Sequence, residues 1–146
     1  MSSLFKIFDT AGSGMAAQST RLNTVASNLA NADTVSSTPD GAYRAKEPLF
    51  ATLRDNALKA AGADPSQDDG TSGVQTLGVS ESQADIQTRY EPGNPMADAD
   101  GYVYGSNVNP IDELVNMISA SRSYQNNVEV MNTAKQLMLK TLDVGK

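Results

Sequence analysis

The chain has 146 residues, 39% of them hydrophobic, and its 17 acidic and 11 basic side chains give it a net charge of −6. It contains no cysteine and no histidine, so disulfides, thiolate metal sites and histidine general bases are excluded. Nucleic acid is not an expected partner, because phosphate binding needs clustered Lys and Arg.

The N-terminal segment, residues 1–34, is predicted to be one helical arm that ends near Ala32. Gly12 and Gly14 each weaken a helix by about 1 kcal/mol relative to alanine, so we expect a kink or a frayed segment there. No basic region precedes the apolar residues, as a secretory signal would require. A heptad pattern with one polar break runs along the arm: Leu4, Phe8, Ala11, Met15, Gln18, Leu22, Val25, Leu29 and Ala32.

The faces of this arm beside the heptad pattern carry amides, hydroxyls and alanine instead of charges. Between Asp9 and Asp33 the only charged residue is Arg21. A surface that avoids charge resembles the core of a protein interface. One chain of this length cannot enclose such a helix, so the pattern favours an ordered assembly of several chains. A compact monomer or dimer is the alternative.

The middle segment, residues 35–109, is predicted to be a small β-rich outer domain. Residues 57–73 are rich in small, acidic and turn residues and are expected to form a flexible surface loop. The Asp100-Gly101 pair beside alternating tyrosines predicts a hairpin within residues 97–105. Three further stretches resemble strands: residues 43–50, 74–80 and 82–90.

The C-terminal segment, residues 110–146, is predicted to be a second helical arm. Asn109 is the expected N-cap, Pro110 the first helical residue, and Asp112 and Glu113 the acidic first turn. Heptad spacing continues along this arm through Leu114, Ile118, Ser121, Gln125 and Val128, with Met117, Tyr124, Met131 and Met138 beside it.

No motif in the chain predicts catalysis, a cofactor or a metal. The Asp98-x-Asp100-Gly101 sequence would need an oxygen ligand in place of Met96 and a glutamate in place of Asn107 to form an EF-hand loop. No phosphate-binding loop occurs, and no serine has a histidine partner. We therefore do not expect an enzyme.

Two arginines stand alone in the weakly charged parts of the arms. Arg21 and Arg122 are interpreted as hydrogen-bonding forks that reach a neighbouring chain. The alternative is that both side chains extend along the surface to solvent.

One long motif resembles a known family. The segment SGMAAQSTRLNTVASNLANADT, residues 13–34, resembles the N-terminal signature of the bacterial flagellar rod and hook family. NADTVSSTPDGAYRAKEPLF, residues 31–50, and the chain from Tyr90 to Gly145 are similar to a short proximal-rod member. Residues 51–73 match no pattern of that family. The signature falls on Gly14, Met15, Gln18, Arg21, Leu22, Ala26, Asn28, Leu29, Ala30, Asn31, Thr34, Pro92, Gly93, Pro95, Asp100, Gly101, Tyr102, Val103, Asn107, Val108, Asn109, Met117, Arg122 and Tyr124.

The resemblance implies a mainly α fold, in which long N- and C-terminal helices form a coiled-coil-type bundle beside a small β and loop domain. It implies a structural subunit of the basal-body rod, the drive shaft of the flagellum. Such a subunit polymerises through its terminal helices, transmits torque and encloses the export channel. The implied location is the periplasmic space, reached through the flagellar type III apparatus.

The implied partners are copies of the chain, other rod subunits, and the membrane-embedded MS ring and export gate at the rod base. Insertion into the membrane is not expected. A secreted coiled-coil adaptor that forms a closed oligomer is the alternative function. The predicted assembly interface comprises Met15, Gln18, Arg21, Leu22, Val25, Asn28, Leu29, Asn31, Leu114, Ile118, Arg122, Tyr124, Val128 and Met131.

Overall fold

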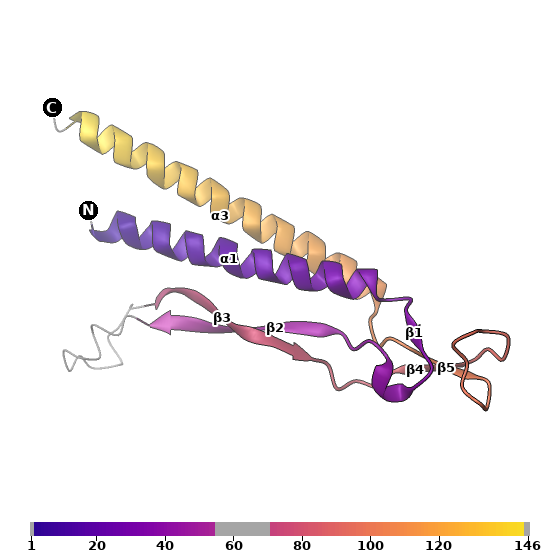
Figure 1. The fold of residues 1–146 in the computed structure, drawn as a ribbon. Helices are drawn as coiled ribbons and strands as arrows, with labels where there is room; N and C mark the ends of the chain where they lie inside the picture. Colours follow the sequence, from indigo (N-terminus) through magenta and orange to yellow (C-terminus); the bar gives the residue numbers. More distant parts are fainter. Residues whose placement is uncertain (1, 55–70, 145–146) are drawn as a thin grey trace. The chain divides into compact units, whose positions relative to one another are not determined.

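Two long helices and several short strands make up the computed structural model, which describes residues 2–54 and 71–144 (Figure 1). Within these residues, neither helix is long and apolar enough to cross a membrane. The predicted combination of two terminal helices and a small sheet region is confirmed, whereas coiled-coil packing stays a prediction. In chain order the elements are α1 (Ser2–Ala30), β1 (Val35–Ser36), η1 (Pro39–Gly41), β2 (Lys46–Arg54), β3 (Thr71–Glu81), β4 (Gln87–Tyr90), β5 (Tyr102–Gly105) and α3 (Pro110–Val144).

The strands form two small sheets. β2 and β3 pair with each other, and β5 lies between β1 and β4. Both neighbours of β5 run antiparallel to it, with Val35 opposite Gly105 and Tyr90 opposite Tyr102. Most of the expected loop 57–73 lies outside the described residues, and its last three residues belong to β3. The division into segments 1–34, 35–109 and 110–146 stays a prediction.

The described chain forms two compact units, each with its own core. Unit 1 takes its residues from Met1–Thr20, Phe50–Leu77 and Ala120–Lys146, and unit 2 from Arg21–Leu49 and Gly78–Ser119. The two cores differ in composition. The buried apolar residues of unit 1 are Ala11, Ala17, Ala120 and Ala134; those of unit 2 are Val25, Ala42, Val103 and Val108, joined by the buried polar Thr24, Asn28 and Ser106.

α1 continues without a break through Gly12 and Gly14, so the expected frayed segment is wrong, and the expected kink stays a prediction. A Cβ on Gly14 would lie 2.8 Å from the side-chain nitrogen of Asn127 in α3. The absence of that Cβ therefore lets the Asn127 amide lie against α1. Packing against α3 stabilises the helix where its propensity is low, because most helical stability in proteins comes from tertiary contacts.

The start of α3 follows the predicted cap. The Asn109 Oδ1 accepts a hydrogen bond from the Ile111 amide at 3.1 Å, and its Nδ2 donates to Asp112 at 2.8 Å. Pro110 is the first helical residue, and Asp112 and Glu113 lie in the first turn. The cap satisfies an amide that would otherwise lack a partner at the helix end.

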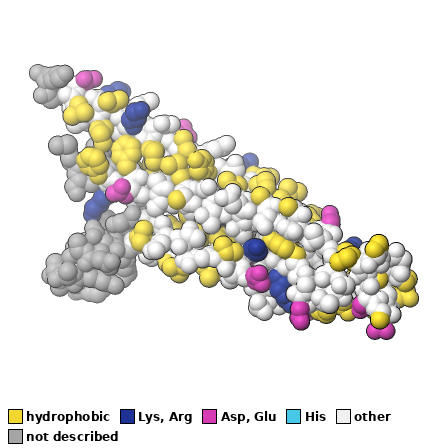
Figure 2. All heavy atoms as spheres, in the orientation of Figure 1, with side chains coloured by type: hydrophobic (Ala, Val, Ile, Leu, Met, Phe, Trp, Pro, Cys, Tyr) yellow, Lys and Arg dark blue, Asp and Glu magenta, His cyan; other side chains and the backbone are white. Residues whose placement is uncertain are grey.

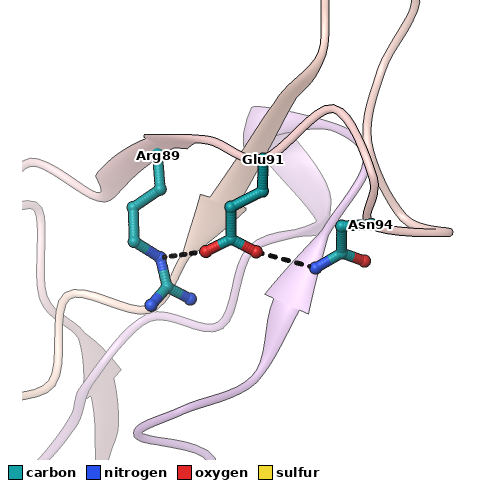
Figure 3. Close-up of polar contacts among 3 residues, drawn as sticks. All are labelled: Arg89, Glu91 and Asn94. Carbon is teal, nitrogen blue, oxygen red and sulfur yellow. Dashed lines mark hydrogen bonds and ion pairs between the residues drawn. The ribbon is translucent and has the colours of Figure 1, made fainter.

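The predicted hairpin within residues 97–105 is wrong in its pairing. The strand that pairs with β5 across the turn is β4, and the connection covers residues 91–101. Gly101, at φ +85°, occupies the tight turn before β5, where a Cβ would lie 2.9 Å from the Tyr90 ring. Figure 3 shows the start of this connection, where Glu91 accepts a hydrogen bond from Asn94 at 2.9 Å and pairs with Arg89 at 3.5 Å. An Asp-Gly turn indicates where the chain reverses, but it does not determine which preceding strand pairs with the strand that follows.

Candidate assembly interface

Asn28 is the centre of the polar contacts in unit 2, and its side chain is 1% exposed. Its Nδ2 donates to the Lys46 carbonyl at 2.9 Å and to Glu113 at 3.2 Å. Its Oδ1 accepts from the Lys46 amide at 2.8 Å and from the Tyr43 hydroxyl at 3.0 Å. All four hydrogen-bonding positions of the amide are used, so Asn28 joins α1, the start of β2 and the first turn of α3.

Asn107 holds the segments that lead into and out of the strands of unit 2. Its Oδ1 accepts from the Ala45 amide at 2.6 Å, and its Nδ2 donates to the Ala84 carbonyl at 2.9 Å. Arg44 donates to the same Ala84 carbonyl at 3.2 Å. Ser106 adds a hydrogen bond to the Ala32 carbonyl at 2.9 Å. The polar side chains that follow β5 therefore have specific partners inside unit 2.

The two predicted arginine forks differ in their surroundings. Arg21 is half-buried and donates from a guanidinium nitrogen to the Asn116 side chain at 3.1 Å, which joins α1 to α3. Arg122 is exposed on α3. The contact of Arg21 is within the chain, whereas a contact of either arginine with another chain stays a prediction.

The predicted interface residues of α1 are all covered to some degree by the chain itself. Val25 and Asn28 are buried, and the others are half-buried: Met15, Gln18, Arg21, Leu22, Leu29 and Asn31. The Oε1 of Gln18 is buried, and no hydrogen-bond donor reaches it in the described residues. A buried acceptor of this kind lowers stability unless it is paired. The polar break in the heptad pattern is thus a weak point of the helix packing in unit 1.

The predicted interface residues of α3 lie mostly on its uncovered side. Leu114 is 50% exposed and Ile118 55% exposed, and Arg122 and Tyr124 are also exposed. Val128 and Met131 are half-buried. The chain itself instead covers alanines, with Ala120 at 0% exposure and Ala134 at 4%. Sequence reasoning did not include Ile111 and Val115, although both lie at helical spacing from Leu114 and Ile118 and are exposed.

Exposed apolar side chains continue along the helices beyond the predicted residues. Figure 2 shows hydrophobic side chains gathered on the helical part of the face in view, with few charged groups among them. The large apolar side chains that are exposed on the helices of unit 1 include Ile7 of α1 and, on α3, Val130, Leu137, Leu139 and Leu142. Contiguous exposed apolar surface on a protein marks an interaction site.

Asp98 organises the turn that precedes β5. Its carboxylate accepts hydrogen bonds from the Tyr102 amide at 2.8 Å, the Asp100 amide at 3.0 Å and the Tyr104 hydroxyl at 3.0 Å. The Tyr102 amide makes the largest contribution to lowering the pKa of Asp98, with the Tyr104 hydroxyl adding to it. The same bond to Asp98 raises the pKa of the Tyr104 hydroxyl. These contacts hold a turn, and no group of three acidic side chains able to hold a metal occurs in ranges 2–54 and 71–144.

Comparison with known proteins gives matches at both ends and over nearly the full length. Residues 8–35 match the model of the flagella basal body rod protein family, and residues 99–144 match the C-terminal model of flagellar basal body rod FlgEFG proteins. The flagellar basal-body rod protein FlgC of Salmonella typhimurium is 53% identical over 144 residues, covering 98% of each chain. FlgC of Escherichia coli O157:H7 is 54% identical with the same coverage, and FlgC of Yersinia enterocolitica is 51% identical over 99% of each chain.

Proposed function

Because this chain belongs to the FlgC family of flagellar basal-body rod proteins and is a structural subunit of the rod, we propose that it polymerises through its two terminal helices. In the polymer, helices of neighbouring copies and of other rod subunits pack in coiled-coil fashion. The exposed interface residues Leu114, Ile118, Arg122 and Tyr124 contact neighbouring subunits directly. The covered ones shape and hold the helix surface: Met15, Gln18, Arg21, Leu22, Val25, Asn28, Leu29, Asn31, Val128 and Met131.

One observation supports polymerisation most directly. The chain buries alanines of α3 and leaves larger apolar side chains of the same helix exposed. Ile111 is 72% exposed, whereas Ala120 is fully buried. Burying a side chain such as Ile or Leu contributes about 1.5–3 kcal/mol, and that gain is available only when another chain covers it. The exposed apolar side chains of α3 would therefore add to stability only when another chain covers them in the assembly.

The wider role follows from family membership and is part of the same proposal. The polymer forms a length of the drive shaft, encloses the export channel and transmits torque. Each subunit passes through the flagellar type III apparatus and is incorporated in the periplasmic space. At the base of the rod the subunits contact the MS ring and the export gate. The role is structural and does not involve catalysis.

A single charge on the exposed side of α3 tests the proposal. Ile118→Asp places a carboxylate where the polymer would exclude water, so we expect the loss of rod incorporation and of swimming. Ser119→Asp is the matched control, because Ser119 is an exposed neighbour on the same helix and Asp adds the same charge. The measurements are swimming in soft agar, the amount of each variant in purified basal bodies, and circular dichroism of each purified chain.

Two outcomes separate polymerisation from the closed-oligomer alternative. If Ile118→Asp swims like the parent while its helix content is unchanged, the exposed side of α3 is not an assembly surface. If the parent chain sediments as a discrete dimer or tetramer and is absent from purified rods, the closed adaptor is the better description.

A further inference from the structure

We propose that the free edge of β4 binds an extended segment of a neighbouring rod subunit, which adds one strand to the sheet of β1, β5 and β4. All three of these strands belong to unit 2. This contact rests on the proposed function and lies outside the terminal helices. Its hydrogen-bonding groups are the main-chain N–H and C=O of Thr88 and Tyr90.

The register of β4 on β5 determines which of its main-chain groups face outward. The Glu91 amide donates to the Gly101 carbonyl at 2.9 Å, one residue beyond the last pair of the two strands. Bonded and non-bonded pairs alternate along an antiparallel ladder, so Arg89 is bonded to β5, whereas Thr88 and Tyr90 are not. The N–H and C=O groups of Thr88 and Tyr90 therefore point away from β5.

The strand opposite β4 supports this orientation. Tyr102 stands opposite Tyr90, and its main-chain groups are bonded to Asp98 on the side away from β4. The Tyr102 amide donates to the Asp98 carboxylate at 2.8 Å, and the Tyr102 carbonyl accepts from the Asp98 amide at 2.8 Å. The two residues of a non-bonded pair direct their main-chain groups to opposite sides of the ladder. Tyr90 therefore directs its own groups to the free edge of the sheet.

The free edge of β4 is exposed. The strand order leaves β4 with one neighbour, and all four of its residues are exposed, with Tyr90 at 65%. Within residues 2–54 and 71–144, no hydrogen-bond partner reaches the outward main-chain groups of Thr88 and Tyr90. These groups repeat at about 7 Å along the strand, and an extended backbone presents complementary groups at the same spacing.

The side chains of β4 leave room for such a strand. Natural proteins often protect a free edge with lysine, proline or a bulge, and β4 contains none of these. Its one charged residue, Arg89, pairs with Glu91 at 3.5 Å (Figure 3), so the edge is close to neutral. The rings of Tyr90 and Tyr102 lie with their centroids 5.2 Å apart. An aromatic or β-branched residue of the added strand opposite Tyr90 would extend this contact.

A second copy of this chain is the poorer occupant. Two β4 strands that use both outward residues of each copy would place Arg89 opposite Arg89, and like charges directly opposite each other destabilise a strand pair. Among the other described strands, β1 has two residues and β2 contains Pro48, which has no N–H to donate. In β3 the Val74 amide already donates to α1. The added segment therefore comes from another rod subunit.

Thr88→Pro tests the contact, because proline removes the outward N–H of Thr88 and no hydrogen bond to β5. Gln87 is already in a strand, as suits a residue before proline. We expect the purified variant to keep the helix content of the parent, while its amount in purified basal bodies and its swimming fall by about tenfold. Thr88→Val is the matched control, because it keeps the N–H and favours a strand, so it should assemble like the parent.

Amide hydrogen exchange of the parent chain gives a second measurement that needs no variant. In the free chain, the Thr88 and Tyr90 amides should exchange with solvent faster than the Arg89 amide, which is bonded to β5. In purified rods, exchange at Thr88 and Tyr90 should slow by about tenfold or more, because the added strand accepts their hydrogen bonds.

A folded Thr88→Pro variant that enters rods and swims like the parent would overturn the proposal, with the proposed function unaffected. If that variant does not fold, equal exchange of the Thr88 and Tyr90 amides in rods and in the free chain has the same meaning. Because the natural chain has no cysteine, an Arg89→Cys variant that forms a disulfide between two copies in rods would show paired β4 strands and overturn the choice of another subunit. A parent chain missing from the rods of swimming cells would instead contradict the proposed function.

Discussion

The two units of the chain are stabilised in different ways. Unit 2 has a core of valines and an amide, Asn28, whose four hydrogen-bonding positions all have partners. Among the described residues of unit 1 the buried apolar side chains are alanines, and the buried oxygen of Gln18, the polar break, has no hydrogen-bond partner there. Larger apolar side chains of unit 1, such as Val130 and Leu137, remain exposed.

This difference indicates which contacts one chain completes and which it leaves to neighbours. A saturated amide is costly to disturb and fixes geometry, because each partner it loses is left buried and unpaired. Alanine packing allows helices to approach closely but contributes less burial energy per residue. Unit 2 therefore specifies a shape within the chain through its polar contacts, and both units leave apolar side chains of α3 exposed, Ile111 and Ile118 in unit 2 and Val130 and Leu137 in unit 1.

The largest expected effect comes from removing the amide of unit 2. Asn28→Leu leaves the Lys46 backbone groups without their partner and removes one of the two hydrogen bonds of the Tyr43 hydroxyl, which keeps its contact with Ser27 at 3.1 Å, so we expect the free energy of unfolding to fall by about 3 kcal/mol. Urea denaturation followed by circular dichroism measures it. Asn23→Ala is the control, because Asn23 is exposed on the same helix, and its effect should stay within about 0.5 kcal/mol. Equal effects of the two changes would remove the distinction between the units.

A smaller loss is expected at the contact of β3 with α1 in unit 1. Gly73 has φ +141°, its added Cβ would collide with the Ser13 side chain, and Ser13 accepts a hydrogen bond from the Val74 amide at 3.1 Å. Gly73→Ala should lower the free energy of unfolding by about 2 kcal/mol. Gly78→Ala is matched in backbone conformation, at φ +154°, but its Cβ meets nothing within 4 Å. If both variants lose the same stability, the Ser13 contact contributes nothing.

Gln18 offers a change in the opposite direction. Gln18→Leu removes the buried unpaired oxygen, so we expect the isolated chain to gain about 1 kcal/mol in its free energy of unfolding. Thermal unfolding of the purified chain measures the gain. The exposed Gln125→Leu is the control and should leave the melting temperature nearly unchanged. A loss of stability in Gln18→Leu would show that the glutamine is satisfied and that unit 1 has no such weak point.

The smallest expected effect is a change in the pKa of Tyr104, whose hydroxyl contacts Asp98 in the turn of unit 2. Asp98→Asn removes the acceptor of the Tyr104 hydroxyl bond, so the raised pKa of Tyr104 should fall toward its ordinary value. Because the folded pKa is raised, the bond stabilises the fold below the ordinary tyrosine pKa and is lost as pH rises through the folded value. Ultraviolet titration of the variant and the parent measures the shift. An unchanged tyrosine titration would show that the bond is absent in solution.

Local signals in the sequence were sufficient for the elements that depend on nearby residues. The Asn109 cap, Pro110 and the acidic first turn predicted the start of α3, because a helix cap is made by residues within one turn of each other. The charge-poor faces of α1 led us to expect enclosure by other chains, whereas the partners of Asn28 lie within its own chain. The motif in residues 13–34 indicated the family that the full-length relatives show.

Only the tertiary structure decided which residues meet across the chain. The partners of Asn28 come from β2 and α3, and nothing near residue 28 identifies them. The Gly12 and Gly14 pair predicted a kink or a frayed segment, yet α1 is continuous there and Asn127 of α3 lies against Gly14. α3 has apolar residues on more than one face, so spacing alone could not distinguish its covered alanines from exposed residues such as Ile111 and Ile118. That choice depends on a second helix, because burial is a property of the packed pair and not of either sequence pattern.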